Sequence, residues 1–544
     1  MTPPVTTGRH AAQRRAPEAS TPNGAGSKRH ARSGNSNGVR SATVWSYAMT
    51  LGKLAMTTGL SLVLAAMLGP RAFGVIAMAL VFTNFIEMIQ QQGMMPAIIA
   101  RKTLRDEHKD TAFWLVIGAG VACTSVGLLV APLWAGLNDL PELTLVIQVL
   151  ALSVPLSSSV VVHEAILRRR LEFKKLTIRT WSSVLAGGAA GIGGAVLGWG
   201  VWALVAQQLV MNATTVVVLW GVSSWRPRLR FSGQAARELW SYAARSSTSS
   251  LGLFLGGRVD IILAGALFGP IVVGLYRMGQ RLTQMVVDVT ARSMQAVALP
   301  SLSALQDDRD AFAERLLRMQ RIVAALTFPT LGVVAGIAPV VERLLGPEWQ
   351  GTTVAIQVLA ISQGLYSLAL VLSPAMQARG RPGTVAVLVW IWAGAAAAAL
   401  VGAATVPVDG TDGQLLVLCL AITAASAVGA TMTMIAASRV FEVRIVTILG
   451  SSGPAVAAGV AAGAATWAIQ SAITSPLVGA VVAGMLGVTV AATILALLDP
   501  VVRGAVRPFL DSDLRRRAAP PPAANPASDR LAGLPVDRAF TSRE

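Results

Sequence analysis

The sequence predicts an all-α polytopic membrane protein with about fourteen transmembrane helices, arranged as two pseudo-symmetric six-helix lobes followed by two C-terminal helices. Three features predict this fold: long apolar stretches, an alternating charge pattern in the loops, and an internal repeat. Of the 544 residues, 53% are hydrophobic and only 13% are charged, and the mean hydropathy is +0.60. A soluble domain could not bury so much apolar surface.

Fourteen long apolar stretches predict transmembrane helices. A helix needs about 20 apolar residues to cross about 30 Å of hydrocarbon. Each stretch is expected to be helical, because lipid offers the backbone no hydrogen-bond partners. The predicted spans are residues 43–68, 73–98, 111–136, 142–167, 180–199, 201–224, 240–267, 270–298, 322–345, 352–377, 383–405, 413–436, 446–469 and 474–498.

The loops between these spans alternate in charge. Six of them hold 22 Lys and Arg residues, at 101–110, 168–180, 225–238, 301–321, 379–383 and 438–445. The intervening loops hold essentially only Arg71. Because Lys and Arg resist translocation, the basic loops are expected in the cytoplasm. We therefore predict a multi-pass protein of the cytoplasmic (inner) membrane with both termini cytoplasmic.

The net charge of +18 lies in these loops and in the tails. Anionic inner-leaflet lipids are the partner that such cations predict, and we expect no nucleic acid. The polar ends of the chain are typical of disordered cytoplasmic tails. The predicted domains are a basic tail at 1–42, an N-lobe at 43–238, a C-lobe at 239–437, two more spans at 438–499 and a tail at 500–544.

An internal repeat relates the two lobes. Four segments recur in the same order at offsets that grow slowly along the chain. Because each lobe has an even number of spans, the lobes should be parallel, with a substrate cavity between them near mid-membrane. The matched pairs are Trp45–Ala48 with Trp240–Ala243, Leu68–Gly74 with Phe268–Gly274, Pro96 with Pro300, and Ile147–Leu152 with Ile356–Ile361.

Charged residues inside the spans suggest what fills that cavity. A charge at bilayer depth costs roughly 2.5–3.5 kcal/mol on insertion scales, so it must face protein or water. The eighth span carries Arg277, Arg281, Asp288 and Arg292 at helical spacings that place them on one face. The second span, its partner in the repeat, carries polar residues on one face in the same way.

We interpret these residues as the lining of a hydrated, net positive cavity that suits an anionic substrate, since Arg offers a fork of donors matched to phosphate or carboxylate. The alternatives are internal ion pairs, such as Lys53 with Glu87 or Asp288 with Arg292, and snorkelling of residues near span ends, Arg292 among them. The predicted substrate-binding residues are Lys53, Asn84, Arg258, Arg277 and Arg281. The predicted ion-coupling or ion-pairing residues are Glu87, Asp260, Asp288 and Arg292.

No catalytic residue, metal site or cofactor is predicted. Cys123 and Cys419 each lie in a span, without the spacing of a metal site or disulfide. The chain has no Gly-rich loop ending in Lys-Ser/Thr, which argues against ATP hydrolysis as its energy source.

The paired lobes, the Leu68–Gly74 turn and the stretch from Leu152 through Arg169 to Phe173 resemble polysaccharide exporters and lipid-linked oligosaccharide flippases. These belong to the multidrug/oligosaccharidyl-lipid/polysaccharide (MOP) superfamily, and the colanic acid or teichuronic acid exporters are the most similar type. The resemblance implies a V-shaped pair of lobes that flips undecaprenyl-(pyro)phosphate-linked sugar units to the outer leaflet. It also implies a cationic central cavity and, as partners, a lipid-linked anionic glycan and other polysaccharide-assembly proteins.

Three other functions compete with this reading. A cation-coupled multidrug antiporter of the same superfamily needs acids in its lumen, where this chain has mostly bases. A membrane glycosyltransferase, polymerase or ligase needs a sizeable extracytoplasmic loop, whereas the longest predicted outer loop is only residues 405–413. A scaffold has no use for intramembrane Arg.

Overall fold

The computed structural model describes residues 33–89, 94–101, 103–240, 258–473 and 475–499, and every long regular element in these ranges is an α-helix. The predicted tails therefore lie largely outside the described residues, as does most of the seventh span with Arg245. The N-terminal helices are α1 (Ser33–Ile89), α2 (Met95–Ala100), α3 (Asp106–Leu137), α4 (Pro141–Leu152), α5 (Val154–Ser158), α6 (Val161–Arg169), α7 (Phe173–Val196) and α8 (Val201–Val222). The C-terminal ones are α10 (Val259–Val289), α11 (Ala291–Ser303), α12 (Arg309–Leu345), the 3-10 helix η2 (Pro347–Trp349), α13 (Thr352–Ala378), α14 (Pro382–Ala404), α15 (Gly410–Phe441), α16 (Ile445–Gly450), α17 (Gly453–Ala472) and α18 (Pro476–Leu498).

The predicted fold class is confirmed. In the described ranges, eleven helical stretches are long and apolar enough to cross a membrane. Two of them fold back on themselves, at Gly69 in α1 and at Gly269 in α10, where φ is 71° and 78°. Only glycine adopts this left-handed conformation readily, and a proline follows each one. Both repeat turns therefore break their helices at the same place in the motif.

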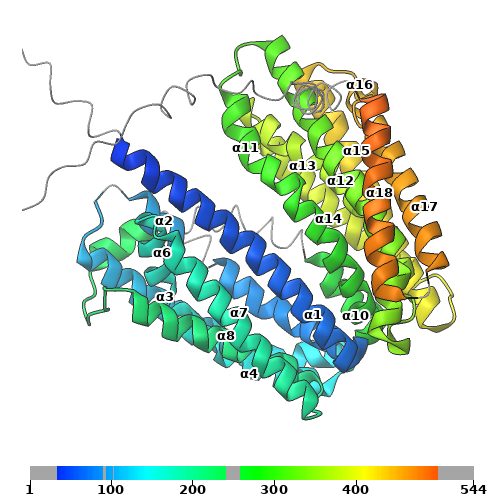
Figure 1. Ribbon diagram of the computed structural model, residues 1–544. Coiled ribbons are helices and arrows are strands. Elements are labelled where there is room, and N and C mark those ends of the chain that lie inside the picture. The colour runs from blue at the N-terminus through cyan, green and yellow to red at the C-terminus, as the bar shows by residue number, and fades with distance from the viewer. Residues whose placement is uncertain (1–32, 90–93, 102, 241–257, 474, 500–544) are drawn as a thin grey trace, which may run out of the picture.

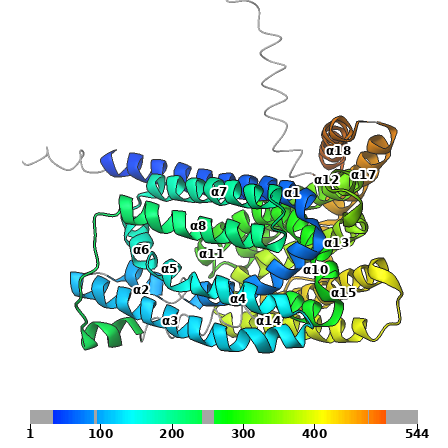
Figure 2. The ribbon, with the colours of Figure 1, turned by 90° about the horizontal axis from the view of Figure 1, so that it is seen from below.

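The helices form two groups that meet at one end. In Figure 1 the N-lobe, blue to teal, lies beside the C-lobe, green to orange, and α1 contacts α10 where the groups meet. The last two helices stand apart from this junction. They pack on α12, on the side of the C-lobe away from the N-lobe, and Figure 2 shows α17 and α18 at that corner.

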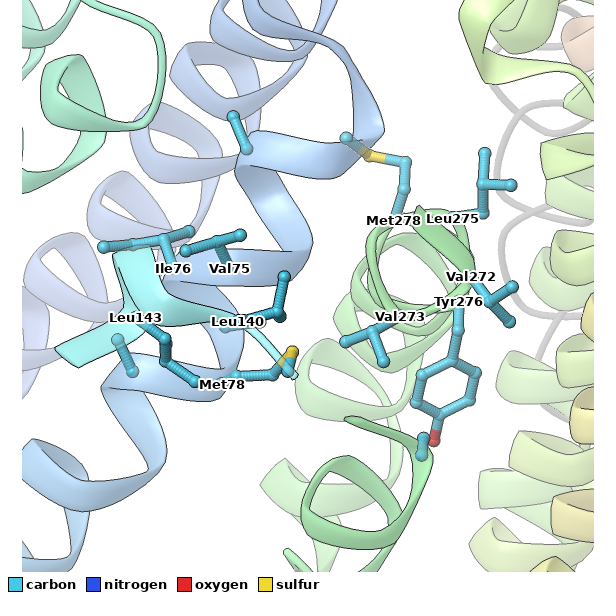
Figure 3. Close-up of a cluster of buried hydrophobic side chains, with 14 of the residues drawn as sticks. Val75, Ile76, Met78, Leu140, Leu143, Val272, Val273, Leu275, Tyr276 and Met278 are labelled. Atoms are coloured by element: carbon cyan, nitrogen blue, oxygen red, sulfur yellow. The ribbon is translucent and has the colours of Figure 1, made fainter. Parts of the chain in front are cut away.

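A buried apolar cluster joins the lobes at the junction. Figure 3 shows Val75 and Met78 of α1 beside Leu140, with Val272, Val273 and Met278 of α10 on the opposite side. All of these side chains are less than 10% exposed. Close van der Waals packing of this kind holds the two lobes together, since lipid is itself apolar and supplies no hydrophobic driving force.

The two repeat turns touch each other reciprocally inside this cluster. A Cβ atom added to Gly74 would lie 1.8 Å from the carbonyl oxygen of Pro270. A Cβ added to Gly274 would lie 1.9 Å from the carbonyl oxygen of Pro70. Neither position can hold a side chain without moving backbone. The contact is nearly symmetric, as expected where a pseudo-twofold axis passes between the lobes.

Several predicted spans are interrupted within the described residues: 270–298 between α10 and α11, 446–469 between α16 and α17, and most strongly 142–167. Residues 142–167 were predicted as a single helix, but α4, α5 and α6 divide this segment. The break follows Ser153, whose hydroxyl donates to the carbonyl of Leu150 at 2.7 Å, and Pro155 occupies the first turn of α5. Both features favour the end of one helix and the start of the next.

Candidate functional site: a cationic cavity between the lobes

A cavity of about 1230 Å³ lies between the lobes. The first arm of α1, together with α6 and α7, forms the N-lobe wall, and α10 with α11 forms the C-lobe wall. The wall includes Leu171 and Ser293, at the end with basic loops, and stops short of the turns at Gly69 and Gly269. The lining thus extends toward the basic-loop end, and the apolar cluster closes the lobe interface at the other end.

Cations outnumber acids on this wall. Its seven cations are Lys53, Arg168, Arg179, Arg258, Arg277, Arg281 and Arg292. Its two acids, within the described residues, are Glu164 and Asp288. The lining therefore carries a clear excess of positive charge, at a depth where few counter-ions are available from the protein.

Both acids are already engaged in ion pairs. Asp288 pairs with Arg292 one helical turn away, at 2.5 Å. Glu164 pairs with Arg168 at 2.7 Å and with Arg179 of the neighbouring helix α7 at 2.6 Å. In the part of the chain that the structure describes, these acids leave Lys53, Arg277 and Arg281 without an ion pair.

The two central arginines bind neutral oxygens instead. Arg277 Nη1 donates to the side-chain oxygen of Gln280 at 2.5 Å. Arg281 Nη2 donates to the main-chain carbonyl of Thr57 in α1 at 2.7 Å, which links the C-lobe to the N-lobe across the cavity. A guanidinium has five donors in a fixed fork. Each of these arginines keeps several donors for a ligand.

Of the predicted substrate-binding residues, Lys53, Arg258, Arg277 and Arg281 lie on the wall. Asp288 and Arg292, predicted as ion-coupling or ion-pairing residues, lie there too. Asn84 and Glu87 do not line the described wall. They lie on the second arm of α1, whereas the lining part of α1 is residues 46–58 of its first arm. No close ion pair joins Lys53 to Glu87 among the described residues.

Asp260 lies behind the wall. Its carboxylate accepts hydrogen bonds from the hydroxyl of Tyr276 at 2.6 Å and from the amide of Gln280 at 2.7 Å. It is therefore a neighbour of the cavity through Gln280, which does line it.

Sequence reasoning missed the cavity role of the N-lobe triad Glu164, Arg168 and Arg179. The two arginines lie in the predicted basic loop at 168–180, and Glu164 lies in the predicted span at 142–167. The spacing of four residues between Glu164 and Arg168 could have predicted their ion pair, because it places both on one helical face. Their position on the cavity wall depends on how α6 packs against α7, which no local pattern reveals.

Residues 63–354, more than half of the chain, match the family described as polysaccharide biosynthesis protein. The chain belongs to this family. It is 26% identical over 369 residues to the succinoglycan biosynthesis transport protein ExoT of Rhizobium meliloti, covering 68% of this chain and 74% of ExoT. It is 24% identical over 303 residues to the teichuronic acid biosynthesis protein TuaB of Bacillus subtilis, covering 55% of this chain and 62% of TuaB. The second relative is thus matched over less than two thirds of its length.

Solved structures share the fold. The lipid II flippase MurJ, in an inward closed conformation, superposes with a TM-score of 0.66 at 12% identity, covering 86% of this chain and 100% of MurJ. An inward-facing multidrug resistance transporter of the MATE family and MOP superfamily superposes with a TM-score of 0.55 at 15% identity. The match covers 74% of this chain and 99% of the transporter. The resemblance to MOP-superfamily polysaccharide exporters is confirmed. The fold is the one that these membrane transporters share.

Proposed function

We propose that this protein flips undecaprenyl-(pyro)phosphate-linked oligosaccharide or polysaccharide repeat units across the cytoplasmic membrane, by alternating access through the cationic cavity. The charge of the cavity wall carries this proposal. Seven cations face two acids, and both acids are already paired. A phosphate or pyrophosphate group would supply the missing negative charge and match the forked donors of Arg277 and Arg281.

The shape of the cavity supports the same substrate. Its volume of about 1230 Å³ exceeds the roughly 300–1000 Å³ of ordinary small-molecule pockets, so it has room for several sugar rings. If the basic loops are cytoplasmic and the cavity opens at that end, its mouth faces the leaflet in which a lipid-linked unit is assembled. This conformation is then the loading state.

The orientation itself is tested by reporter fusions. A periplasm-active reporter fused after Glu544 should give no signal, and the same reporter inserted near Asp409, in the loop before α15, should be active. The opposite pattern would place the cavity mouth on the outer side and contradict loading from the inner leaflet.

Binding to the purified protein tests the substrate class. Native mass spectrometry can measure the binding of undecaprenyl pyrophosphate. We expect it to bind at least tenfold more tightly than the cationic dye ethidium. Arg277→Ala should weaken pyrophosphate binding about tenfold or more, since a charge-assisted contact is lost. Arg343→Ala is the matched control, because Arg343 in α12 bonds to Gln470 and lies off the wall. Tighter binding of ethidium would favour a multidrug antiporter.

The basic loops and tails suggest further partners. Anionic inner-leaflet lipids suit the cations of the loops, and other polysaccharide-assembly proteins stay predicted partners. Asp260, Glu87, Asp288 and Arg292 stay our candidates for ion coupling or ion pairing, and the pairing of Asp288 with Arg292 favours a pairing role for these two.

A further inference from the structure

A hydrogen-bonded network lies behind the cavity wall, where the two arms of α10 fold against each other. Asp260 precedes the turn at Gly269 and Tyr276 follows it, so the hairpin brings both to a similar depth. The Tyr276 hydroxyl donates to Asp260 Oδ2 at 2.6 Å. Tyr276 is fully buried in the apolar cluster between the lobes, and neither it nor Asp260 lines the cavity.

Gln280 connects this network to the cavity. Its Nε2 donates to Asp260 Oδ2 at 2.7 Å and lies 2.8 Å from the Tyr276 hydroxyl. Because the nitrogen end of the amide faces these two oxygens, the Oε1 end must face the other way. There it accepts from Arg277 Nη1 at 2.5 Å. A flipped amide would set its oxygen against the Asp260 carboxylate and offer Arg277 a second donor, which is unfavourable at both ends.

We propose that Asp260 and Tyr276 are positioning residues for Arg277: they fix the amide of Gln280, and through it the orientation of the Arg277 guanidinium toward the cavity. This inference rests on the proposed function, which gives Arg277 its ligand. A long, flexible side chain held in its binding orientation has less freedom to lose when the ligand arrives. The network would thus raise affinity without touching the substrate.

The competing explanation is that the network only ties the two arms of α10 together. The variant Tyr276→Phe distinguishes the two explanations, because it removes one hydroxyl and keeps the buried ring and the charge of Asp260. If the network positions Arg277, its effect on binding must pass through Arg277. If it serves only packing, its effect must be the same whether or not the guanidinium is there.

A substrate-independent measurement tests the positioning directly. Phenylglyoxal labels arginine side chains, and peptide mass spectrometry of the full chain in detergent gives the rate at each site. In Tyr276→Phe we expect Arg277 to react about threefold to tenfold faster, the change that matches one lost hydrogen bond. Arg292 is the internal control, since its partner Asp288 is untouched. An unchanged rate at Arg277 would overturn the proposal.

A double-mutant cycle then tests the consequence for binding. Tyr276→Phe should weaken binding of undecaprenyl pyrophosphate by about threefold to tenfold in the native background, and by less than twofold in Arg277→Ala. Equal weakening in both backgrounds, or none in the native one, would overturn the positioning role. If Tyr276→Phe does not accumulate as folded protein, Gln280→Leu replaces it in both measurements. If Arg277→Ala itself leaves binding unchanged while labelling responds to Tyr276→Phe, the proposed function fails and the positioning stands.

Discussion

The closed end and the cavity end of the lobe interface are built from the same two helices, α1 and α10, yet they differ in chemistry. At the closed end the backbones of the two turns touch, around Gly74 and Gly274, and apolar side chains fill the surroundings. At the cavity end the same helices carry Lys53, Arg277 and Arg281. Close apolar packing joins the lobes at one end, whereas the cavity wall at the other end carries an excess of positive charge.

The largest expected effect comes from breaking the closed end. Gly274→Ala places a methyl group where only 1.9 Å separates it from the Pro70 carbonyl. Overpacking of this kind costs typically about 1–3 kcal/mol, and here the obstacle is backbone, so we expect the upper part of that range. The melting temperature should fall by several degrees, and glycan export should be lost.

Gly118→Ala in α3 is the matched control, since an added Cβ meets nothing within 4 Å there. It should leave both melting temperature and export near normal. Equal behaviour of the two variants would show that the turns do not need their close approach.

The next effect concerns the N-lobe side of the cavity. Glu164→Gln removes the acid that joins Arg168 to Arg179, at a site where Glu164 is 13% and Arg179 16% exposed. Two guanidinium groups then face each other without the acid between them, and we expect the free energy of unfolding to fall by about 2 kcal/mol, in line with lost charge-assisted hydrogen bonds.

Glu314→Gln provides the comparison for that measurement. Glu314 also pairs with an Arg four residues on, Arg318, but at the surface, where the two side chains are 72% and 52% exposed. Its loss should change stability by about 0.5 kcal/mol or less. Thermal unfolding of the two variants in the same detergent measures both losses of stability. Similar shifts in melting temperature would refute a buried role for Glu164.

The smallest effect lies at the closed end again. Trp349, 1% exposed, donates its indole N–H to the Ala65 carbonyl of α1 at 2.9 Å and packs edge-on against Phe73. Trp349→Phe keeps an aromatic ring but loses the donor, and should cost about 1 kcal/mol. A change in melting temperature as large as that of Gly274→Ala would mean that this indole, rather than the repeat turns, holds the closed end together.

Much of this comparison could be predicted from the sequence. Turn motifs at Gly69 and Gly269 follow from the repeat, and the face of Arg277 and Arg281 follows from helical spacing. The error was to assume that both lobes use equivalent helices. The repeat placed Asn84 and Glu87 opposite the eighth span, but the N-lobe wall comes from the first arm of α1 with α6 and α7. Which face of a helix lines a cavity depends on packing between distant segments. The periodicity of one segment therefore does not predict that face.

The role of Arg277 and Arg281 in substrate recognition can be measured in cells that carry Arg277→Ala or Arg281→Ala. Glycan export and the amount of protein in the membrane are measured together. We predict that either Ala variant accumulates normally and exports less than about a tenth of the glycan, in line with a lost charge-assisted contact. Lys at either position should restore only part of the export, because it keeps the charge but loses the fork. Normal export by the Ala variants, or their failure to accumulate, would contradict a role for these arginines in substrate recognition.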